Sequence, residues 1–389
     1  MDSIDYSVPR ELDIELPKRQ SAFLWGPRKT GKSTWLKEKF AGSIYYDLLK
    51  TDVFIRLMKE PWLLREDLLA KNERELSRPI ILDEVQKVPQ VLDEIHWLIE
   101  NRGLRFVMCG SSARKLKRGQ ANLLGGRAWR LAMFPLTWKE LPTLELVRAL
   151  GAGLLPPHYF SGSPGLSIKA YVEDYLREEI KAEGLVRSLP SFARFLDALG
   201  YSHGELTNYA NIARDCGVDA KTVRSYYEIL NDTMLGRFVP PFVPKSGRQM
   251  ITSAEKFYLC DVGVAGHLCG RTVAGEKGEA FGRAFEHFVL MELWAHSSYS
   301  KADYEVRFWR TKTGHEVDFV LGEGKVAVEV KGVSRVDSGM LKSLKVFVEE
   351  HKPRHAIVVC NEHTARQHGG ITILPWRVFF ERLWEGKVV

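Results

Sequence analysis

Short apolar runs alternate with longer amphipathic stretches through the first third of the chain. The apolar runs lie at residues 22–25, 44–46, 80–82 and 104–109. Each has the length of a buried strand, and between them residues 33–40 and 51–72 carry apolar side chains at helical spacing, with a break at Pro61. Strands that alternate with helices are typical of α/β domains with a parallel sheet. We therefore predict that fold class for this part of the chain.

The first apolar run leads directly into a glycine-rich loop, GPRKTGKS, at residues 26–33. The loop matches the phosphate-binding (P-loop) pattern GxxxxGK[ST] at every fixed position, and it stands between a predicted strand and a predicted helix, as the pattern requires. Gly26 and Gly31 allow the backbone to wrap closely around an anion at a helix N-terminus. Lys32 would contact the β- and γ-phosphates, and the Ser33 hydroxyl would ligate Mg²⁺.

A second signal is the run PIILDEVQ at residues 79–86, a short apolar strand that ends in two carboxylates. This is the Walker B pattern, in which Asp83 would hold Mg²⁺ through water and Glu84 would polarise the attacking water. Alone, such a pattern is as often a strand that ends in an acidic turn. Here it follows the P-loop at the distance that one helical excursion requires, so the two patterns together predict ATP hydrolysis.

Two further segments could complete this site. The run 104–109 ends in Gly110-Ser111-Ser112, and small hydroxyls at the end of a parallel strand can orient the lytic water and sense the γ-phosphate. Arg127 follows a glycine turn and could act as a finger in the site of a neighbouring subunit, which implies a homo-oligomer, with a hexameric ring as one form. A surface arginine is an equally supported alternative. The predicted nucleotide-binding residues are Gly26, Pro27, Arg28, Lys29, Thr30, Gly31, Lys32, Ser33, Thr34, Asp83 and Ser111.

Composition adds little to these patterns. The 389 residues are 45% hydrophobic and 27% charged, as in ordinary globular proteins, and they are enough for two or three domains. The formal net charge of +7 slightly favours a polyanionic partner. The five cysteines form no CxxC pair, which argues against a disulfide framework or a zinc site. No run approaches the about 18 apolar residues of a membrane span. We therefore expect a cytoplasmic protein without membrane contact.

The middle of the chain follows a Gly-, Pro- and Ser-rich junction at residues 151–167 and begins with helical patterns. Residues 206–213 and 219–227, joined by a turn at Cys216-Gly217-Val218, predict a helix-turn-helix in which Asp219 caps the second helix. Residues 235–241 would then form the first strand of a wing. A DNA-reading version would use Lys221, Thr222, Arg224 and Ser225 toward a groove, and Arg237, Lys245 and Arg248 toward phosphate. A lid that packs on the ATPase is the alternative, and both are supported about equally.

The last third contains a predicted hairpin, with strands at 316–321 and 325–331 around the turn Gly322-Glu323-Gly324. If the turn centres between Glu323 and Gly324, Asp318 faces Glu329 directly, and Lys331 lies two residues further along the same face. Two carboxylates and a lysine on one face suit one magnesium ion and a phosphate that is attacked. Glu286, on a predicted helix at 279–290, would complete the acidic cluster. An ordinary solvated ladder of charges is the alternative.

These motifs together resemble an AAA+-related ATPase family of bacteria and archaea whose C-terminal half is a domain of formerly unknown function. The resemblance is carried by the loop 26–33, the strand 80–86, Gly110-Ser111-Ser112 and Gly126-Arg127-Ala128, and in the partner domain by Tyr175-Leu176-Arg177, Leu235-Gly236-Arg237 and residues 282–286. Members usually carry a GG-x-P turn near the domain junction, where this chain has Gly162-Ser163-Pro164-Gly165. The set Glu286, Asp318, Glu329 and Lys331 resembles the restriction-endonuclease-like nuclease fold.

The expected organisation has three parts: a P-loop AAA+-type ATPase domain at 1–155, a helical and winged-helix domain at 156–255, and a nuclease-like α/β domain at 256–389. The expected cofactors are ATP and Mg²⁺, with Ser33 and Asp83 as ligands in the first site and Glu286, Asp318 and Glu329 in the second. The expected function is ATP hydrolysis coupled to DNA processing. Two alternatives stand beside it: a motor that remodels branched or duplex DNA without cutting it, and a regulatory ATPase that binds a protein partner.

Overall fold

The computed structural model describes residues 8–112, 124–176, 188–244 and 254–389. The chain divides into two compact units, Met1–Phe134 with Leu230–Leu235, and Pro135–Ile229 with Gly236–Val389. Arg177, Lys245 and Arg248 lie outside the described residues. The boundaries of the three expected domains stay a prediction.

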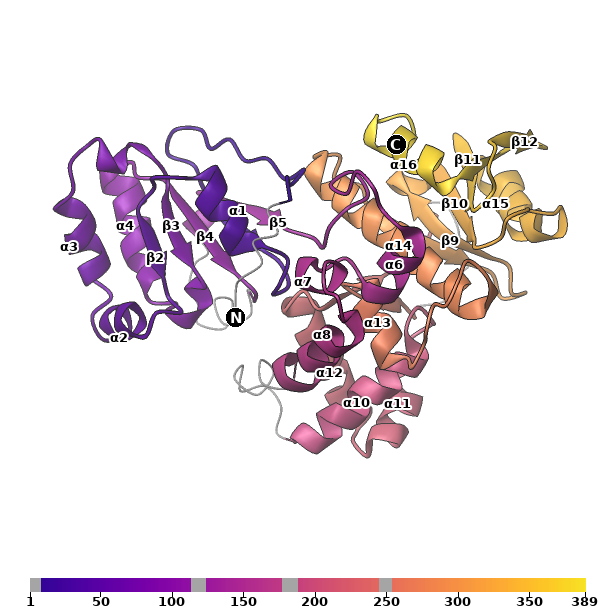
Figure 1. Cartoon of the computed structure of the whole chain (residues 1–389), viewed down its shortest axis with the longest axis horizontal. Coiled ribbons are helices and arrows are strands. Elements are labelled where there is room, and N and C mark those ends of the chain that lie inside the picture. Colours follow the sequence, from indigo (N-terminus) through magenta and orange to yellow (C-terminus); the bar gives the residue numbers. More distant parts are fainter. Residues whose placement is uncertain (1–7, 113–123, 177–187, 245–253) are drawn as a thin grey trace. The chain divides into compact units, whose positions relative to one another are not determined.

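The first unit is built from strands that alternate with helices, as the apolar pattern predicts. Its elements are β1 (Ser21–Trp25), α1 (Lys32–Lys39), β2 (Tyr45–Asp47), α2 (Thr51–Lys59), α3 (Leu63–Leu69), β3 (Ile80–Asp83), α4 (Val91–Arg102), β4 (Phe106–Gly110) and β5 (Ala128–Ala132). Figure 1 draws β2, β3 and β4 between α4 and α1. Every residue of β1, β3 and β4 is buried, which explains why their sequences are continuous apolar runs.

All strands of the first sheet are parallel, in the order β2-β3-β4-β1-β5. The carboxyl ends of parallel strands meet at one edge of a sheet, where α/β proteins bind ligands. The P-loop follows β1 at this edge, Asp83 ends β3, and Gly110 ends β4 in register with Trp25 of β1. The fold therefore gathers the three predicted motifs at one edge.

The second unit begins with helices. These are α6 (Leu146–Ala152), α7 (Pro156–Tyr159), α8 (Pro164–Ala170), a π-helical turn (Tyr171–Leu176), α10 (Leu189–Ser202), α11 (Tyr209–Cys216) and α12 (Ala220–Asp232). The two helices of the predicted helix-turn-helix are α11 and α12, and Asp219 accepts a 2.8 Å hydrogen bond from the Thr222 backbone N–H, as an N-cap does. The predicted wing strand is β6 (Gly236–Val239), which pairs antiparallel with β7 (Lys256–Leu259).

A six-stranded mixed sheet forms the rest of the second unit, in the order β12-β13-β11-β10-β9-β8. Its elements are α13 (Val262–Leu268), α14 (Gly278–Tyr299), β8 (Val306–Arg310), β9 (Glu316–Leu321), β10 (Val326–Lys331), α15 (Lys342–His351), β11 (His355–Cys360), β12 (Arg366–His368), β13 (Ile371–Pro375) and α16 (Trp376–Trp384). The long helix α14 packs against β10 (Figure 1). The α/β class, with a parallel first sheet, a helical middle and a mixed final sheet, is confirmed.

Among the described residues, no helix combines the length and the apolarity that a bilayer crossing requires.

Candidate functional site

The P-loop is wrapped tightly, and its glycines explain how. Gly31 has φ 91° and is the N-cap of α1, while Lys29 also takes a left-handed conformation, with φ 65°. A Cβ atom at Gly26 would lie only 2.4 Å from the carbonyl oxygen of Met133, so a larger residue does not fit there. The loop therefore has the curvature that lets backbone N–H groups face an anion.

Lys32, the first residue of α1, is buried within this loop. Its ammonium donates to the carbonyl oxygens of Gly26 at 2.7 Å and Pro27 at 2.9 Å, and the Thr30 hydroxyl donates to the same Pro27 carbonyl at 2.9 Å. The lysine charge is thus held at the centre of the P-loop. Of the other predicted loop residues, Arg28 and Ser33 are partly exposed and Lys29 and Thr34 are exposed.

Asp83, the last residue of β3, accepts hydrogen bonds from two neutral donors. The Tyr45 hydroxyl donates to Oδ2 of Asp83, and the Cys109 thiol donates to Oδ1 at 2.8 Å. Ser33 lies close enough to Tyr45 to lower the pKa of its hydroxyl. Burial raises the pKa of the Tyr45 hydroxyl and that of the Cys109 thiol, and the Asp83 charge raises both further. The two predicted magnesium ligands of this site, Ser33 and Asp83, therefore share one neighbour.

Glu84 follows Asp83 in a strained conformation, with φ 59° and ψ 44°. The Gln86 side-chain amide donates to Oε2 of Glu84 and, at 3.2 Å, to the Ser111 hydroxyl. All three side chains are buried. The structure thus brings together the two residues expected to act on the lytic water, and it does so through Gln86. Tyr45, Cys109 and Gln86 were not among the predicted site residues.

Arg127 lies elsewhere in the same sheet. It directly precedes β5, and its carbonyl accepts a 3.0 Å hydrogen bond from the N–H of Ser21, the first residue of β1. This is the amino-terminal edge of the strands, opposite to the P-loop. Its guanidinium forms an ion pair with Glu100 of α4. Arg127 therefore does not join the nucleotide site of its own chain.

The predicted hairpin in the second unit has the predicted register. β9 and β10 pair with Val326 opposite Leu321 and Val328 opposite Phe319, the alignment that sets Asp318 against Glu329. Asp318 accepts a 2.7 Å hydrogen bond from the Val330 N–H, and Lys331 forms a 2.6 Å ion pair with Glu329. The set expected from sequence is brought together, because Glu286 of α14 interacts electrostatically with both Asp318 and Glu329.

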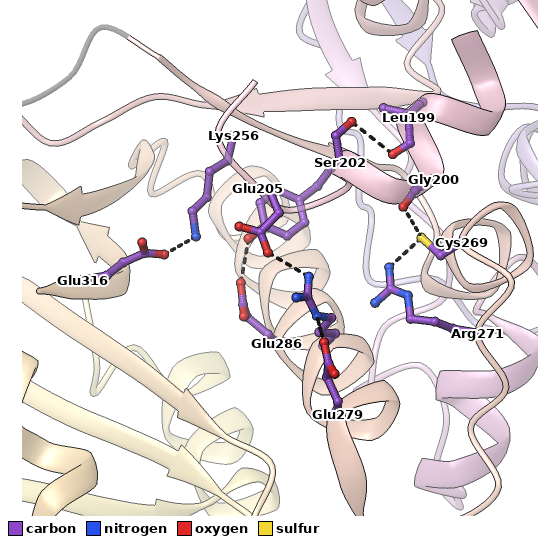
Figure 2. Close-up of polar contacts among 12 residues, drawn as sticks. Leu199, Gly200, Ser202, Glu205, Lys256, Cys269, Arg271, Glu279, Glu286 and Glu316 are labelled. Atoms are coloured by element: carbon purple, nitrogen blue, oxygen red, sulfur yellow. Dashed lines mark hydrogen bonds and ion pairs between the residues drawn. The ribbon is translucent and has the colours of Figure 1, made fainter. Parts of the chain in front are cut away.

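Three further residues belong to this cluster, and the sequence analysis missed them. The Tyr258 hydroxyl donates to Oε1 of Glu286 at 2.6 Å. The Lys256 ammonium forms an ion pair with Glu316, and Figure 2 shows its side chain extending from its strand toward that carboxylate, with Glu286 on the helix nearby. We call Glu286, Glu316, Asp318, Glu329, Lys256, Lys331 and Tyr258 the acidic cluster.

Burial dominates the electrostatics of the acidic cluster. It raises the pKa of Glu286 to about 7 and that of Glu329 to about 8, and the Asp318 charge contributes to both shifts. Burial also raises the pKa of Asp318. For Lys331, burial lowers the pKa, but the charges of Asp318 and Glu329 outweigh it and the net pKa is raised. The carboxylates are therefore crowded and poorly solvated.

The donor set fits a divalent cation. Oε2 of Glu329 is buried and has no hydrogen-bond partner among the described residues, so this carboxylate oxygen could accept a ligand. Over the same residues, no three Asp, Glu, His or Cys side chains gather in the arrangement of a finished metal site. Mg²⁺ commonly takes only one or two protein carboxylates and completes its shell with water and phosphate oxygens. Asp318 and Glu329, with Glu286, would hold such an ion.

The helix-turn-helix presents a mixed surface. Lys221 and Arg224 of α12 are exposed, and Arg224 forms a 3.7 Å ion pair with Glu228, whereas Thr222 and Ser225 are partly exposed. Arg237 of β6 stacks over the Trp294 ring, with its guanidinium carbon 5.7 Å from the ring centroid. Helix α12 therefore offers two exposed cations. The Arg237 guanidinium instead packs within the second unit, against Trp294.

Three protein-family models match segments of this chain. An AAA domain family matches residues 18–142. Residues 18–142 form a P-loop AAA-type ATPase domain. Two families described only as domains of unknown function match residues 147–274 and 281–379 of the chain.

Similar proteins are known from bacteria and an archaeon. Uncharacterized proteins of Mycobacterium tuberculosis and Mycobacterium bovis are each 27% identical over 352 residues, covering 87% of this chain and 76% of theirs. An uncharacterized protein of Methanocaldococcus jannaschii is 21% identical over 361 residues, covering 83% and 77%. The solved structure of the Aeropyrum pernix ORC1 protein in complex with DNA matches with 15% identity, covering 67% of this chain and 88% of that one. Its TM-score is 0.25, and no argument rests on it.

Proposed function

We propose that the first unit hydrolyses ATP with Mg²⁺ and that the protein couples this reaction to DNA processing. The observation that carries the ATPase part is the Tyr45 hydroxyl, which donates to Asp83 and lies close enough to Ser33 of the P-loop for Ser33 to act on its pKa. Lys32 would exchange its two carbonyl partners for phosphate oxygens. Ser33 and Asp83 would hold the metal ion, which neutralises phosphate charge when bound.

Glu84 would accept the proton of the attacking water. Its hydrogen bond with Gln86, which also holds Ser111, supports a fixed orientation toward the γ-phosphate. Arg127 would complete the site of a neighbouring subunit, in a cytoplasmic homo-oligomer, because in its own chain it lies at the opposite edge of the sheet.

The proposal that DNA is the partner rests on the helix-turn-helix α11–α12, with Lys221 and Arg224 exposed on its second helix, and on the net charge of +7. The test is the ATPase rate with and without single-stranded, duplex and branched DNA. We expect stimulation by at least one of them and binding that weakens steeply as salt rises. An ATPase rate that no DNA changes, together with salt-insensitive binding, would favour the regulatory ATPase with a protein partner.

The acidic cluster supports a magnesium-dependent nuclease activity in the second unit. Asp318, Glu329 and Glu286 would hold the ion, which would polarise the phosphodiester and activate water. Lys331, already paired with Glu329, would place a positive charge beside the phosphate as charge develops in the transition state. DNA-stimulated ATP hydrolysis without nicking of any substrate would instead indicate the remodelling motor.

A further inference from the structure

Lys256 is a buried lysine whose position is fixed by backbone pairing on both sides. Its strand, β7, pairs with β6 so that Lys256 lies opposite Val239, and an isolated bridge joins Lys256 to Leu206 on the other side. Its side chain is 5% exposed. A lysine ammonium buried to this degree needs charge compensation, because the loss of hydration is costly.

The acidic cluster provides this compensation. The ammonium pairs with Glu316, lies 5.3 Å from the centroid of the Phe308 ring, and is close enough to Glu286 and Asp318 that their charges act on it. Burial alone would lower the pKa of Lys256, but these carboxylates outweigh burial and keep the side chain a cation. Lys256 thus brings a permanent positive charge into a group of crowded carboxylates.

The carboxylates in turn are already partly satisfied by the chain itself. Glu316 also pairs with Arg310 at 3.2 Å, Glu286 accepts from Tyr258, and Asp318 accepts from the Val330 N–H. Among the fully buried side-chain atoms of the described cluster residues, Oε2 of Glu329 has no hydrogen-bond partner. The acidic cluster therefore has a carboxylate oxygen that could bind a ligand, and Lys256 supplies a cation close to Glu286 and Asp318.

We propose that Lys256 acts as a built-in counterion of the acidic cluster and competes with a divalent cation for the field of Glu286 and Asp318. This inference rests on the proposed metal site of the second unit. A fixed ammonium lowers the negative potential that attracts the ion, so metal binding is weaker than the carboxylates alone would give. Because Lys256 lies on the strand that pairs with the wing, the affinity for metal depends on the position of the β6–β7 hairpin.

The test is calorimetric titration of Mn²⁺ into the full-length protein without nucleotide, carried out in a Lys32→Ala background. We expect Lys256→Met to bind Mn²⁺ at the acidic cluster about ten-fold more tightly or better, since one nearby charge is removed. The control is Lys325→Met, an exposed lysine at the turn end of the same β9–β10 hairpin, whose affinity should not change. Unchanged or weaker binding in a folded Lys256→Met variant would overturn the inference.

A second variant keeps the test decisive if Lys256→Met does not fold. In Glu316→Gln the Lys256 ammonium loses its ion-pair partner and turns to Glu286 and Asp318, so Mn²⁺ should bind more weakly than in the parent. Unchanged or tighter binding would contradict the inference.

Asp318→Ala distinguishes failure of the proposed metal site from failure of the inference about Lys256. If it leaves Mn²⁺ binding as in the parent, the proposed metal site itself fails, and the inference about Lys256 fails with it. If it abolishes binding while Lys256→Met and Glu316→Gln change nothing, the inference about Lys256 alone fails.

Discussion

At the scale of single residues, the two sites balance charge in different ways. Asp83 receives hydrogen bonds from a hydroxyl and a thiol, which are neutral groups, and Lys32 rests on backbone carbonyls. In the acidic cluster, Glu329 is paired with the charged Lys331 instead. A site held by neutral donors keeps its charges available for a ligand of opposite charge. The nucleotide site is therefore organised for phosphate and metal by its own residues.

The first prediction separates binding from turnover at the nucleotide site. Lys32→Ala should abolish ATP binding, because the lysine neutralises phosphate charge in the ground state and the transition state. Glu84→Gln should keep ATP binding and lose turnover by about 100-fold or more, since the carboxylate matters only when water attacks. Calorimetry with ATP and a phosphate-release assay measure the two steps. Lys39→Ala, an exposed lysine at the end of α1, is the control. Undiminished hydrolysis in Glu84→Gln would remove Glu84 from the role of base.

The second prediction follows from the raised pKa of Glu329, about 8 in the folded protein against 4.5 for an ordinary glutamate. Between these two pH values the folded state binds the proton that the unfolded state has released. The free energy of unfolding should therefore fall as pH rises from about 5 to 8 without divalent ions. Glu329→Gln, which stays neutral, should flatten this slope, and Glu349→Gln, on the exposed side of α15, should not. Urea denaturation at several pH values measures the slope. A slope equally steep in Glu329→Gln would contradict the assignment.

At the scale of elements, the β9–β10 hairpin was predictable in register as well as in extent. Strand 316–321 was predicted to the residue, and the short turn fixes which residues face each other, so Asp318 and Glu329 could be placed from local sequence alone. The P-loop and the β3 terminus were predictable for the same reason, because each motif is contiguous and its flanking elements are typical.

Partners that come from distant elements could not be predicted in this way. Lys256 lies on β7, and neither its spacing nor its neighbours in sequence indicate that it meets the acidic cluster. Tyr45 and Cys109 contact Asp83 because β2 and β4 are the neighbours of β3 in the sheet. No local sequence pattern predicts this strand order. The order of the six strands in the second sheet was unpredicted for the same reason.

The third prediction concerns the β9–β10 hairpin. Asp318→Ala removes both a carboxylate and the acceptor for the Val330 N–H. It should eliminate magnesium- or manganese-dependent nicking of labelled DNA while ATP hydrolysis stays near the wild-type rate, because every residue of the acidic cluster lies in the second unit. Asp337→Ala, an exposed aspartate beyond the end of β10, is the control. A wild-type protein that binds no divalent ion without nucleotide and nicks no substrate would end the nuclease proposal.

At the scale of the whole molecule, the chain contains two sites of different chemistry, and each is formed by residues of one unit. The AAA-type ATPase domain holds the first, and the second unit holds the acidic cluster. Among the described residues that form each site, none comes from the other unit. Each activity can therefore be disabled separately in the full chain, and any dependence of one on the other measures coupling between the units.

The fourth prediction tests assembly. Arg127→Ala and Lys32→Ala should each be inactive alone, and a mixture of the two should recover some ATPase activity. In mixed assemblies an intact P-loop on one subunit meets an intact arginine on its neighbour. Arg127 would first have to exchange its ion pair with Glu100. A mixture of Lys32→Ala with Glu84→Gln is the control, because no pairing of these subunits completes a site. No recovery, or a strictly monomeric ATP-bound protein in light scattering, would exclude the action in trans.

The left-handed backbone conformation of Glu84 implies that this residue lowers the stability of the folded protein while it serves ATP turnover. A non-glycine residue held at φ 59° costs on the order of 1–2 kcal/mol, and asparagine or glycine bears that conformation more readily. A library randomised at this one codon and sorted only for heat resistance should therefore enrich Asn or Gly, and the survivors should hydrolyse no ATP. Glutamate as the most heat-resistant choice would mean that neighbouring contacts such as Gln86 compensate for the strain. Enrichment of Asn or Gly would show that glutamate stands at this position because turnover requires it, at a cost in stability.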